Sequence, residues 1–334
     1  MVASLRDVAF ALDPPGPDPW SLQASVALGL WPPLEDGSDI SVLELTRRLG
    51  RAGAELREIA AGGGHAWTHL HRAVIVSELR DRIRDPGIIR QKPTDLCGPF
   101  AVLVELGRRE PWRYVRAAGQ LLEDGTLSMV AGVEIVADAD LRGRPLPAGW
   151  VFEDWCPGEV DWMVSATMRE AENVFEDIDD GEGIEGMTLP GAMEQWTRDL
   201  LGLSSQLFEC YHTDELEAMQ VARHAVNAGG VAFLLVDANL IKDGADDSEE
   251  NMRWQSAAHR RRQPVGSLGP LTHSEDDAWP PDHWVLYLGG LSPANPAEED
   301  MITLKLWSWG SEFAMRGTAE AFGEYLYAVV AGRP

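Results

Sequence analysis

The chain has 334 residues, of which 45% are hydrophobic and 25% charged, a length and balance typical of one large globular domain or two of ordinary size. Its apolar runs stay well short of the ~18 residues that a membrane-spanning helix needs, so we expect no transmembrane segment. The formal net charge of −26 opposes contact with phosphate backbones and anionic lipids, so we expect neither nucleic-acid binding nor membrane docking.

The opening stretch "MVASLRDVAFALDPPGPDPW" has one Arg and a short apolar run, and it then turns to Pro and Asp. That pattern makes a poor secretory signal, so we expect the protein to be cytoplasmic in the cell that produces it. The three cysteines are too few and too scattered for a disulfide framework, and they indicate a reducing compartment. We find no zinc-type spacing, and we expect no metal and no cofactor.

Residues 1–88 are predicted to form a helical N-terminal region. The stretch "ISVLELTRRLGRAGAELREIAAGGG" has leucines near helical spacing and ends in three glycines. A second helix is predicted through "HAWTHLHRAVIVSELRDRIRD", ending before Pro86-Gly87. It would place His65 and His69 one turn apart, a spacing that metals can use. Because no third ligand is evident, we interpret them as ordinary histidines of a helix face.

Helical pattern returns in "GPFAVLVELGRR" and "EPWRYVRAAGQLLEDG", where Pro111 suits a first helical turn and Gly125 a stop. Residues 126–226 are predicted to be mostly short helices and loops.

The last third of the chain changes to strand-like composition. Residues 229–241, 283–290 and 301–309 are rich in Val, Leu and aromatic side chains, and Gly, Pro and Asp separate them. Residues 242–282 are long, polar and Pro-containing, and we interpret them as a loop that covers a site. Helices first and strands last predict an α+β fold with an antiparallel sheet at the C-terminal end.

Cys97, in "QKPTDLCGPF", is the strongest candidate nucleophile. It directly precedes a predicted helix, whose positive end lowers the pKa of a thiol and favours the reactive thiolate. Gly98 would let a substrate backbone come close. Gln91, six residues upstream, could donate its side-chain N–H to a developing oxyanion.

His283 is the candidate general base, because it stands at the first residue of a predicted strand, where the backbone would hold an imidazole rigidly. The next strand, "MITLKLWSWG", should carry the group that orients this imidazole. Trp284 and Trp309, next to the proposed site, could wall a substrate groove.

The order Gln-x5-Cys-Gly-Pro, then His-Trp-Val on one strand and Ser-Trp-Gly at the end of the next, resembles the papain-like cysteine peptidase superfamily. The segment "LCGPF" is most similar to the double-glycine leader peptidases of bacteriocin exporters. The resemblance covers roughly residues 89–334 and implies a papain-like hydrolase domain there. It implies that Gln91 is the oxyanion donor, Cys97 the nucleophile and His283 the general base.

The sequence departs from the papain pattern at the third catalytic position. The Asn of that pattern falls on Trp307, which cannot accept a hydrogen bond from an imidazole N–H. Ser308 is our first candidate for this role and Asp237 the second, with Asn239 also within consideration.

The stretches "VDWMVSATMREAENVF" and "GMTLPGAMEQW" resemble a middle section of bacterial papain-like toxins and effectors, some of which are delivered between cells. The resemblance implies a protein or peptide substrate and a cognate immunity or delivery protein as partners. A protease is the first expectation. A glutamine deamidase or transglutaminase of the same fold, or a catalytically inactive binding module, is the alternative.

The other two cysteines are interpreted as structural. Acidic residues surround Cys156 in "EDWCPGE" and would raise the pKa of its thiol. Cys210 has His212 two residues away, but nothing near it in the sequence supplies an oxyanion donor.

Overall fold

The structure is a computed structural model that describes residues 42–90, 96–130, 132–146, 157–172, 188–210, 214–238, 240–241 and 283–334. Within these ranges the helices are α3 (Val42–Ala61), α4 (Arg72–Arg84), the 3-10 helix η1 (Pro86–Ile88), α5 (Cys97–Arg109), α6 (Pro111–Asp124), α7 (Ala139–Gly143), α8 (Glu159–Glu170), α9 (Pro190–Asp199), α10 (Glu215–Asn227) and α13 (Ala319–Gly323). The strands are β1 (Thr126–Ser128), β2 (Glu134–Val136), β3 (Ser204–Glu209), β4 (Val231–Val236), β5 (His283–Ser292), β6 (Met301–Ser308), β7 (Ser311–Thr318) and β8 (Leu326–Arg333).

The main sheet has six strands in the order β3-β8-β4-β5-β6-β7, and each neighbouring pair is antiparallel. Helices dominate the N-terminal part of the described chain and this sheet dominates the C-terminal part. The prediction of an α+β fold with an antiparallel C-terminal sheet is therefore confirmed.

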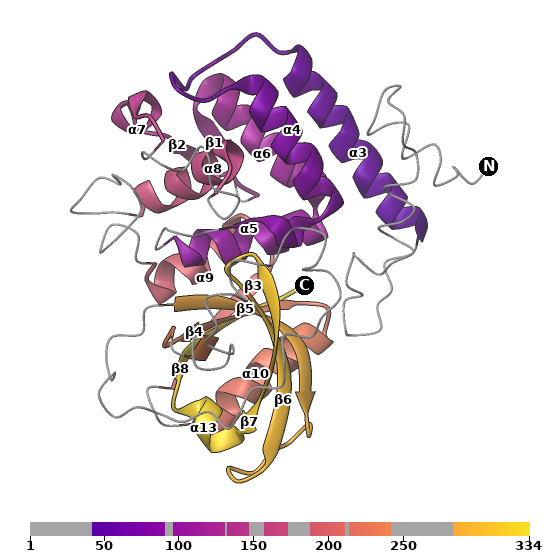
Figure 1. Ribbon diagram of the computed structural model, residues 1–334, viewed down its shortest axis with the longest axis vertical. Helices are drawn as coiled ribbons and strands as arrows, with labels where there is room; N and C mark the ends of the chain where they lie inside the picture. Colours follow the sequence, from indigo (N-terminus) through magenta and orange to yellow (C-terminus); the bar gives the residue numbers. More distant parts are fainter. Residues whose placement is uncertain are drawn as a thin grey trace, which may run out of the picture.

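Both faces of the sheet are covered by helices. Alternate residues of β4 show why: Phe233 and Leu235 belong to the core shared with the helical part, whereas Ala232 and Leu234 face the core under α10 and α13. In Figure 1, α5 lies between the upper helices and the sheet, and α10 and α13 lie on the opposite side of the sheet. All of β4 is buried, as a strand covered on both faces requires.

The helical region and the sheet share one hydrophobic core. It contains Leu49 of α3, Ile75 of α4, Phe100 of α5 and Trp284 of β5, all with at most 1% of their surface exposed. The expected division of the chain into residues 1–88 and 89–334 stays a prediction; within the described residues the core packing is continuous across residue 88.

The second predicted helix starts later than expected, at Arg72. His65 and His69 therefore do not lie on a helix. The chain before Arg72 is extended against α6, where the Ala66 N–H donates to Leu122 O at 2.7 Å and the Trp67 indole N–H donates to Leu121 O at 2.8 Å. These tertiary contacts override the helical pattern of the sequence.

The three predicted strands correspond to β4, β5 and β6, but five other segments of the described chain are also strands. The hairpin β1–β2 and the edge strand β3 lie in the middle region, which we expected to be helices and loops. β7 and β8 follow β6, and β8 takes a central place between β3 and β4. Strand β8, "LYAVVAGR", has alanines and a glycine that weaken its strand pattern, so its pairing depends on its neighbours.

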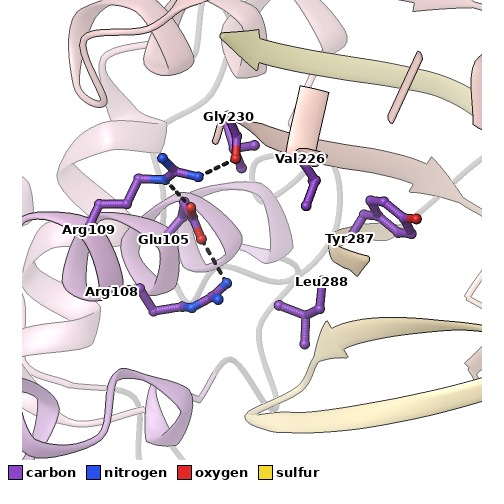
Figure 2. Close-up of a pocket in the computed structure, with 8 residues that line it drawn as sticks. Glu105, Arg108, Arg109, Val226, Gly230, Tyr287 and Leu288 are labelled. Atoms are coloured by element: carbon purple, nitrogen blue, oxygen red, sulfur yellow. Dashed lines mark hydrogen bonds and ion pairs between the residues drawn. The ribbon is translucent and has the colours of Figure 1, made fainter. Parts of the chain in front are cut away.

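Charged contacts fix the C-terminal end of α5 to the sheet (Figure 2). Arg109 donates to Gly229 O at 2.6 Å and to Gly230 O, in the turn before β4, and it also pairs with Glu105. Arg108 donates to the other Glu105 oxygen at 3.0 Å. Burial by itself raises the pKa of the Glu105 carboxyl, but the positive charges of Arg109 and Arg108 outweigh it and hold this pKa below its usual value.

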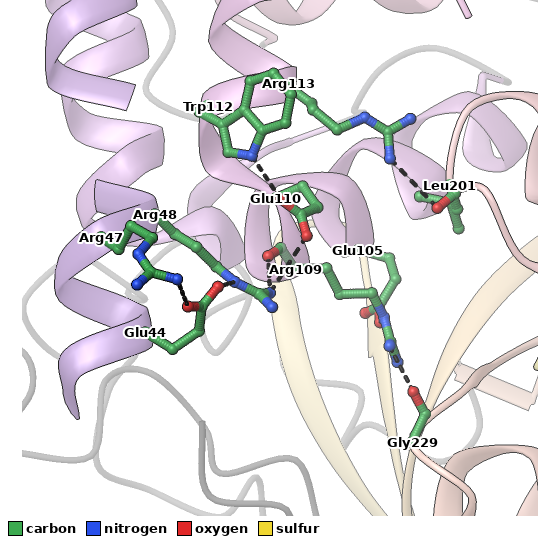
Figure 3. Close-up of polar contacts among 10 residues, drawn as sticks. All are labelled: Glu44, Arg47, Arg48, Glu105, Arg109, Glu110, Trp112, Arg113, Leu201 and Gly229. Atoms are coloured by element: carbon green, nitrogen blue, oxygen red, sulfur yellow. Dashed lines mark hydrogen bonds and ion pairs between the residues drawn. The ribbon is translucent and has the colours of Figure 1, made fainter. Parts of the chain in front are cut away.

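A second set of polar contacts attaches α3 to the junction of α5 and α6 (Figure 3). Arg48 donates to the Arg109 carbonyl at the end of α5, and it pairs with Glu44 at 3.0 Å and with Glu110 at 3.5 Å. These contacts orient α3 against the helix that begins at Cys97.

A buried charge cluster joins α4, α6 and α8. Arg82 donates to both oxygens of the fully buried Asp161, at 2.6 and 3.3 Å, and the Tyr114 hydroxyl donates to the same carboxylate at 3.0 Å. Glu78 accepts from the Val160 N–H, in the first turn of α8, at 2.9 Å. Burial raises the pKa of Glu78 to about 7, against the opposing positive charge of Arg82.

The raised pKa of Glu78 predicts a pH-dependent stability. The folded carboxyl keeps its proton up to about pH 7, whereas the unfolded chain releases it near the usual value of 4.5. The free energy of unfolding should therefore fall as pH rises through this window, by ~1–3 kcal/mol at ~1.4 kcal/mol per pKa unit. Glu78→Gln, which cannot ionise, should flatten this slope in urea denaturation between pH 5 and 8. The exposed-site control Glu58→Gln should keep the wild-type slope, and an unchanged slope in Glu78→Gln would contradict the assignment.

Candidate active site

Cys97 is the first residue of α5, and it is 3% exposed. Leu96, which precedes it, provides no side-chain cap, and the first turn of the helix carries no acidic residue. The positive end of the helix therefore acts on the sulfur without a neighbouring carboxylate in that turn to oppose it. A helix N-terminus favours the thiolate form of a cysteine, whereas burial in apolar surroundings opposes it.

The start of β5 lies directly against this sulfur. The backbone N–H of Trp284 donates to Cys97 Sγ at 3.2 Å, across 187 positions of sequence. Standard peptide geometry then places the His283 Cα within about 6 Å of the sulfur, because His283 supplies the carbonyl half of the same peptide group. The structure thus brings the predicted nucleophile and the predicted base into one neighbourhood.

His283 is held by two neighbouring strands. Its backbone pairs with Val236 of β4, and its Nε2 is hydrogen bonded to the Ser308 hydroxyl at 2.6 Å. Continuing the β5–β6 register beyond Leu286–Trp307 puts Ser308 on the same sheet face as His283, a diagonal pair within side-chain reach. His283 is 3% exposed and Ser308 fully buried, so the contact is shielded from water.

Trp307, the position onto which the motif resemblance puts the papain-type Asn, points away from His283. Its side chain belongs to the core shared with the helices, and its indole N–H donates to Gly87 O at 3.2 Å. Alternation along β6 is the reason: Trp307 faces the helices and Ser308 faces the imidazole.

Trp309 covers the imidazole from the turn between β6 and β7. Its ring centroid lies 5.0 Å from that of His283, with the planes inclined at 38°. Trp309 and Gly310 form a two-residue turn, with φ of 49° and 80°, after the last strand pair Ser308–Ser311. Positive φ at both positions is typical of a type I′ hairpin, but it is costly for a bulky residue such as Trp.

The same turn is packed against the chain that leads toward Cys97. A β-carbon at Gly310 would lie 2.9 Å from Arg90 Cγ and 3.2 Å from Ile89 O, so only glycine fits there. The indole contact of Trp307 with Gly87 lies in the same region. The hairpin that carries Ser308 is thereby fixed relative to the segment before α5.

Thr188 is a residue of this site that the sequence analysis missed. A β-carbon at Gly98 would lie 2.6 Å from Thr188 Oγ1, so Thr188 occupies the space beside the residue after the nucleophile. The Trp284 indole N–H donates to Thr188 O at 2.9 Å. "MTLPG" signals only that a helix begins at Pro190; nothing in the sequence places Thr188 near Cys97.

The remaining predicted residues have the following places. Trp284 is 1% exposed and packs in the core, while Trp309 is half-buried beside His283. Asp237 is buried one residue beyond Val236, the register partner of His283. Cys210 is buried at the end of β3, where its thiol donates to Leu326 O at 3.4 Å. The predictions for Gln91, Cys156, Asn239, the loop 242–282 and residues 1–41 lie outside the described residues.

Among the described residues, no group of three or more His, Cys, Asp or Glu is arranged to hold a metal ion. Across the same ranges, no helix combines the length and the apolar character needed to cross a bilayer. Comparison with protein-family models, curated proteins and solved structures yields no match to the chain.

The chemistry available to this cluster follows from its three groups. A sulfur at a helix N-terminus can act as a nucleophile when a base takes its proton. An imidazole can exchange that proton, and a hydroxyl bonded to one ring nitrogen fixes the orientation of the ring. Cys97, His283 and Ser308 supply these groups in buried surroundings.

The contact between His283 and Ser308 gives a stability prediction. Ser308→Ala leaves a buried imidazole nitrogen without this partner, so we expect the free energy of unfolding to fall by about 1–3 kcal/mol in urea denaturation. Ser204→Ala, at an exposed position of β3 whose hydroxyl bonds the Arg333 carbonyl at 3.2 Å, should cost less than about 0.5 kcal/mol. Equal costs at the two positions would show that the His283 contact does not stabilise the fold.

Proposed function

We propose that this protein is a cysteine hydrolase of papain-like fold that cleaves amide bonds in a protein or peptide substrate. Cys97 is the nucleophile, His283 the general base and Ser308 the residue that orients the imidazole. The observation that carries the proposal is the 3.2 Å hydrogen bond from Trp284 N–H to Cys97 Sγ, next to an imidazole bonded to Ser308 at 2.6 Å.

In the first half of the reaction, His283 takes the proton of the Cys97 thiol, and the sulfur attacks the carbonyl carbon of the substrate. The new S–C bond forms as the C=O π pair moves to oxygen. The Cys97 backbone N–H and the Gln91 side chain donate hydrogen bonds to that oxyanion. The tetrahedral intermediate then collapses, the C–N bond breaks, and the imidazolium gives its proton to the leaving amine.

In the second half, the neutral imidazole takes a proton from water, and the oxygen of that water attacks the thioester. Collapse of the second intermediate releases the carboxylic acid and returns the sulfur as the leaving group. Ser308 keeps the ring in one orientation through both halves, in the role that an amide or carboxylate fills in related triads.

The Trp309 ring supports this proposal by its position over His283. An apolar ring beside the His283–Ser308 hydrogen bond excludes water, and a hydrogen bond in such surroundings is stronger than one in water. A tryptophan held at a φ of 49° is a local cost that this protective role would offset.

Two other functions share parts of this site. A deamidase or transglutaminase would form the same thioester from a glutamine side chain and would differ only in the group that resolves it. A binding module without activity is favoured by one observation: Cys97 and His283 are each 3% exposed, as structural residues would be.

Alkylation separates a nucleophile from a structural thiol. At pH 7 we expect iodoacetamide to label Cys97 at least about 10-fold faster than Cys210, because Cys97 has a helix N-terminus and a neighbouring imidazole to favour its thiolate. Labelling is followed by mass spectrometry of the cysteine peptides, with Cys97→Ser as the blank. His283→Ala should slow labelling of Cys97 and leave Cys210 unchanged. Equal slow labelling of both thiols would favour the binding module.

The proposed biological role is that of a bacterial toxin or effector, held in the cytoplasm of the producing cell and delivered into another cell. Its partners would be the substrate protein and a cognate immunity or delivery protein. The support for this role is the sequence resemblance of the segments around residues 160–175 and 186–196 to effector proteins of papain-like type.

Expression in host cells tests this role. We expect the wild-type protein to arrest growth of a susceptible bacterial or eukaryotic host by at least about 10-fold in colony count, and Cys97→Ala to restore it. Immunoblotting checks that both proteins accumulate equally. Thiol-selective labelling without any growth difference in either host would leave the hydrolase in place and reject the toxin role.

A further inference from the structure

Thr188 carries a buried hydroxyl that makes no hydrogen bond to the described part of the chain. The residue is 3% exposed, and its Oγ1 has no hydrogen-bond partner within the described ranges of the chain. Burying an unpaired hydroxyl costs about 1–3 kcal/mol, so most buried hydroxyls find an acceptor or donor in the folded chain. The other buried hydroxyls of this region do so: Thr197, in the following helix α9, donates to Met193 O at 2.8 Å.

The unused hydroxyl lies at the first turn of α5. Its oxygen is 2.6 Å from the position of a β-carbon on Gly98, which puts it within about 4 Å of the Gly98 Cα. Gly98 follows Cys97 directly, and Pro99 has no N–H, so the backbone donors at the tip of α5 belong to Cys97 and Gly98. The Thr188 hydroxyl therefore stands beside the part of the helix where negative charge would be stabilised.

One residue fixes both the sulfur and Thr188. The backbone N–H of Trp284 donates to Cys97 Sγ at 3.2 Å, and its indole N–H donates to Thr188 O at 2.9 Å. Contact between Thr188 and Gly98 closes this ring of contacts. Thr188 thus has a defined place relative to the nucleophile, although 91 positions separate them in sequence.

We propose that the Thr188 hydroxyl donates a hydrogen bond to the carbonyl oxygen of the substrate acyl group as that oxygen becomes an oxyanion. The role rests on the proposed hydrolase function. The Thr188 hydroxyl would be a third hydrogen-bond donor to the oxyanion, beside the Cys97 backbone N–H and the Gln91 side chain. This arrangement fits a substrate that presents an amide or ester carbonyl at the N-terminus of α5. The proton stays on Thr188 throughout, and only the hydrogen bond strengthens as charge develops.

The test compares two reagents that react with the same sulfur. Iodoacetamide alkylates Cys97 by displacement of iodide, so no oxyanion forms. p-Nitrophenyl acetate acylates Cys97 through a tetrahedral oxyanion and releases p-nitrophenolate, which absorbance follows. Cys97→Ala gives the background for the ester, and mass spectrometry confirms that the acetyl group is on Cys97.

Thr188→Val keeps the size and shape of the side chain and removes the hydroxyl. We expect it to slow acylation by the ester by about 100-fold, the scale for loss of one oxyanion donor, and to leave alkylation within about 2-fold of wild type. Thr188→Ser, which keeps the hydroxyl, should retain most of the acylation rate. The thermal midpoint of Thr188→Val should equal or exceed that of wild type, because an unpaired buried hydroxyl is removed.

Each other outcome rejects the role for a distinguishable reason. Acylation of Thr188→Val within about 3-fold of wild type shows that the hydroxyl does not contact the oxyanion. A parallel loss of both rates shows that Thr188 acts on the sulfur instead. Loss of thermal stability in Thr188→Val would show that Thr188 has a structural role. Acylation of Thr188→Ser that is as slow as that of Thr188→Val would show the same. A wild-type Cys97 that reacts no faster than Cys210 rejects the hydrolase itself, and this role with it.

Discussion

The contact between the first residue of α5 and the first residues of β5 is the constraint on which the rest of the site depends. The backbone N–H of Trp284, which could have bonded to a neighbouring strand, donates instead to the sulfur of Cys97. Because the donor belongs to the rigid backbone of a central strand, the position of the sulfur relative to His283 does not depend on any flexible side chain. A site built between a helix and a strand is more exact than one built on loops.

The core explains why that contact can hold. Every residue of α5 from Cys97 to Gly107 is buried, as expected for a helix enclosed by other helices above and a sheet below. At its far end, Arg109 holds the turn before β4, which is the strand paired with β5. Both ends of the helix are thus fixed to the same sheet. A lone charge at the buried end would be costly, but Glu105 forms ion pairs with Arg108 and Arg109 there.

Features that cost stability gather near the sulfur. Trp309 adopts a φ of 49° beside His283, and Ser308 and His283 bury a polar pair. Thr188 buries a hydroxyl that finds no partner within the ranges that the structure describes. Such features also occur elsewhere in the described part of the chain, as at Asp214 with a φ of 64° and at the buried Trp196 indole nitrogen, whereas Gly125 ends α6 in an ordinary left-handed conformation. Local strain and unused polar atoms in one region are what a binding or catalytic site requires of its scaffold.

The sequence by itself determined the α+β class, the helices α5 and α6 with their Pro and Gly boundaries, and the candidates Cys97, His283 and Ser308. These follow from local signals: periodicity, caps and turn residues, together with short motifs. Only the tertiary structure decided that α4 begins at Arg72, that β8 lies inside the sheet between β3 and β4, and that Thr188 lies beside Gly98. It also decided that Ser308, rather than Trp307, faces the imidazole. Such outcomes depend on strand register and on contacts between residues far apart in the chain, and neither leaves a pattern in a local stretch of sequence.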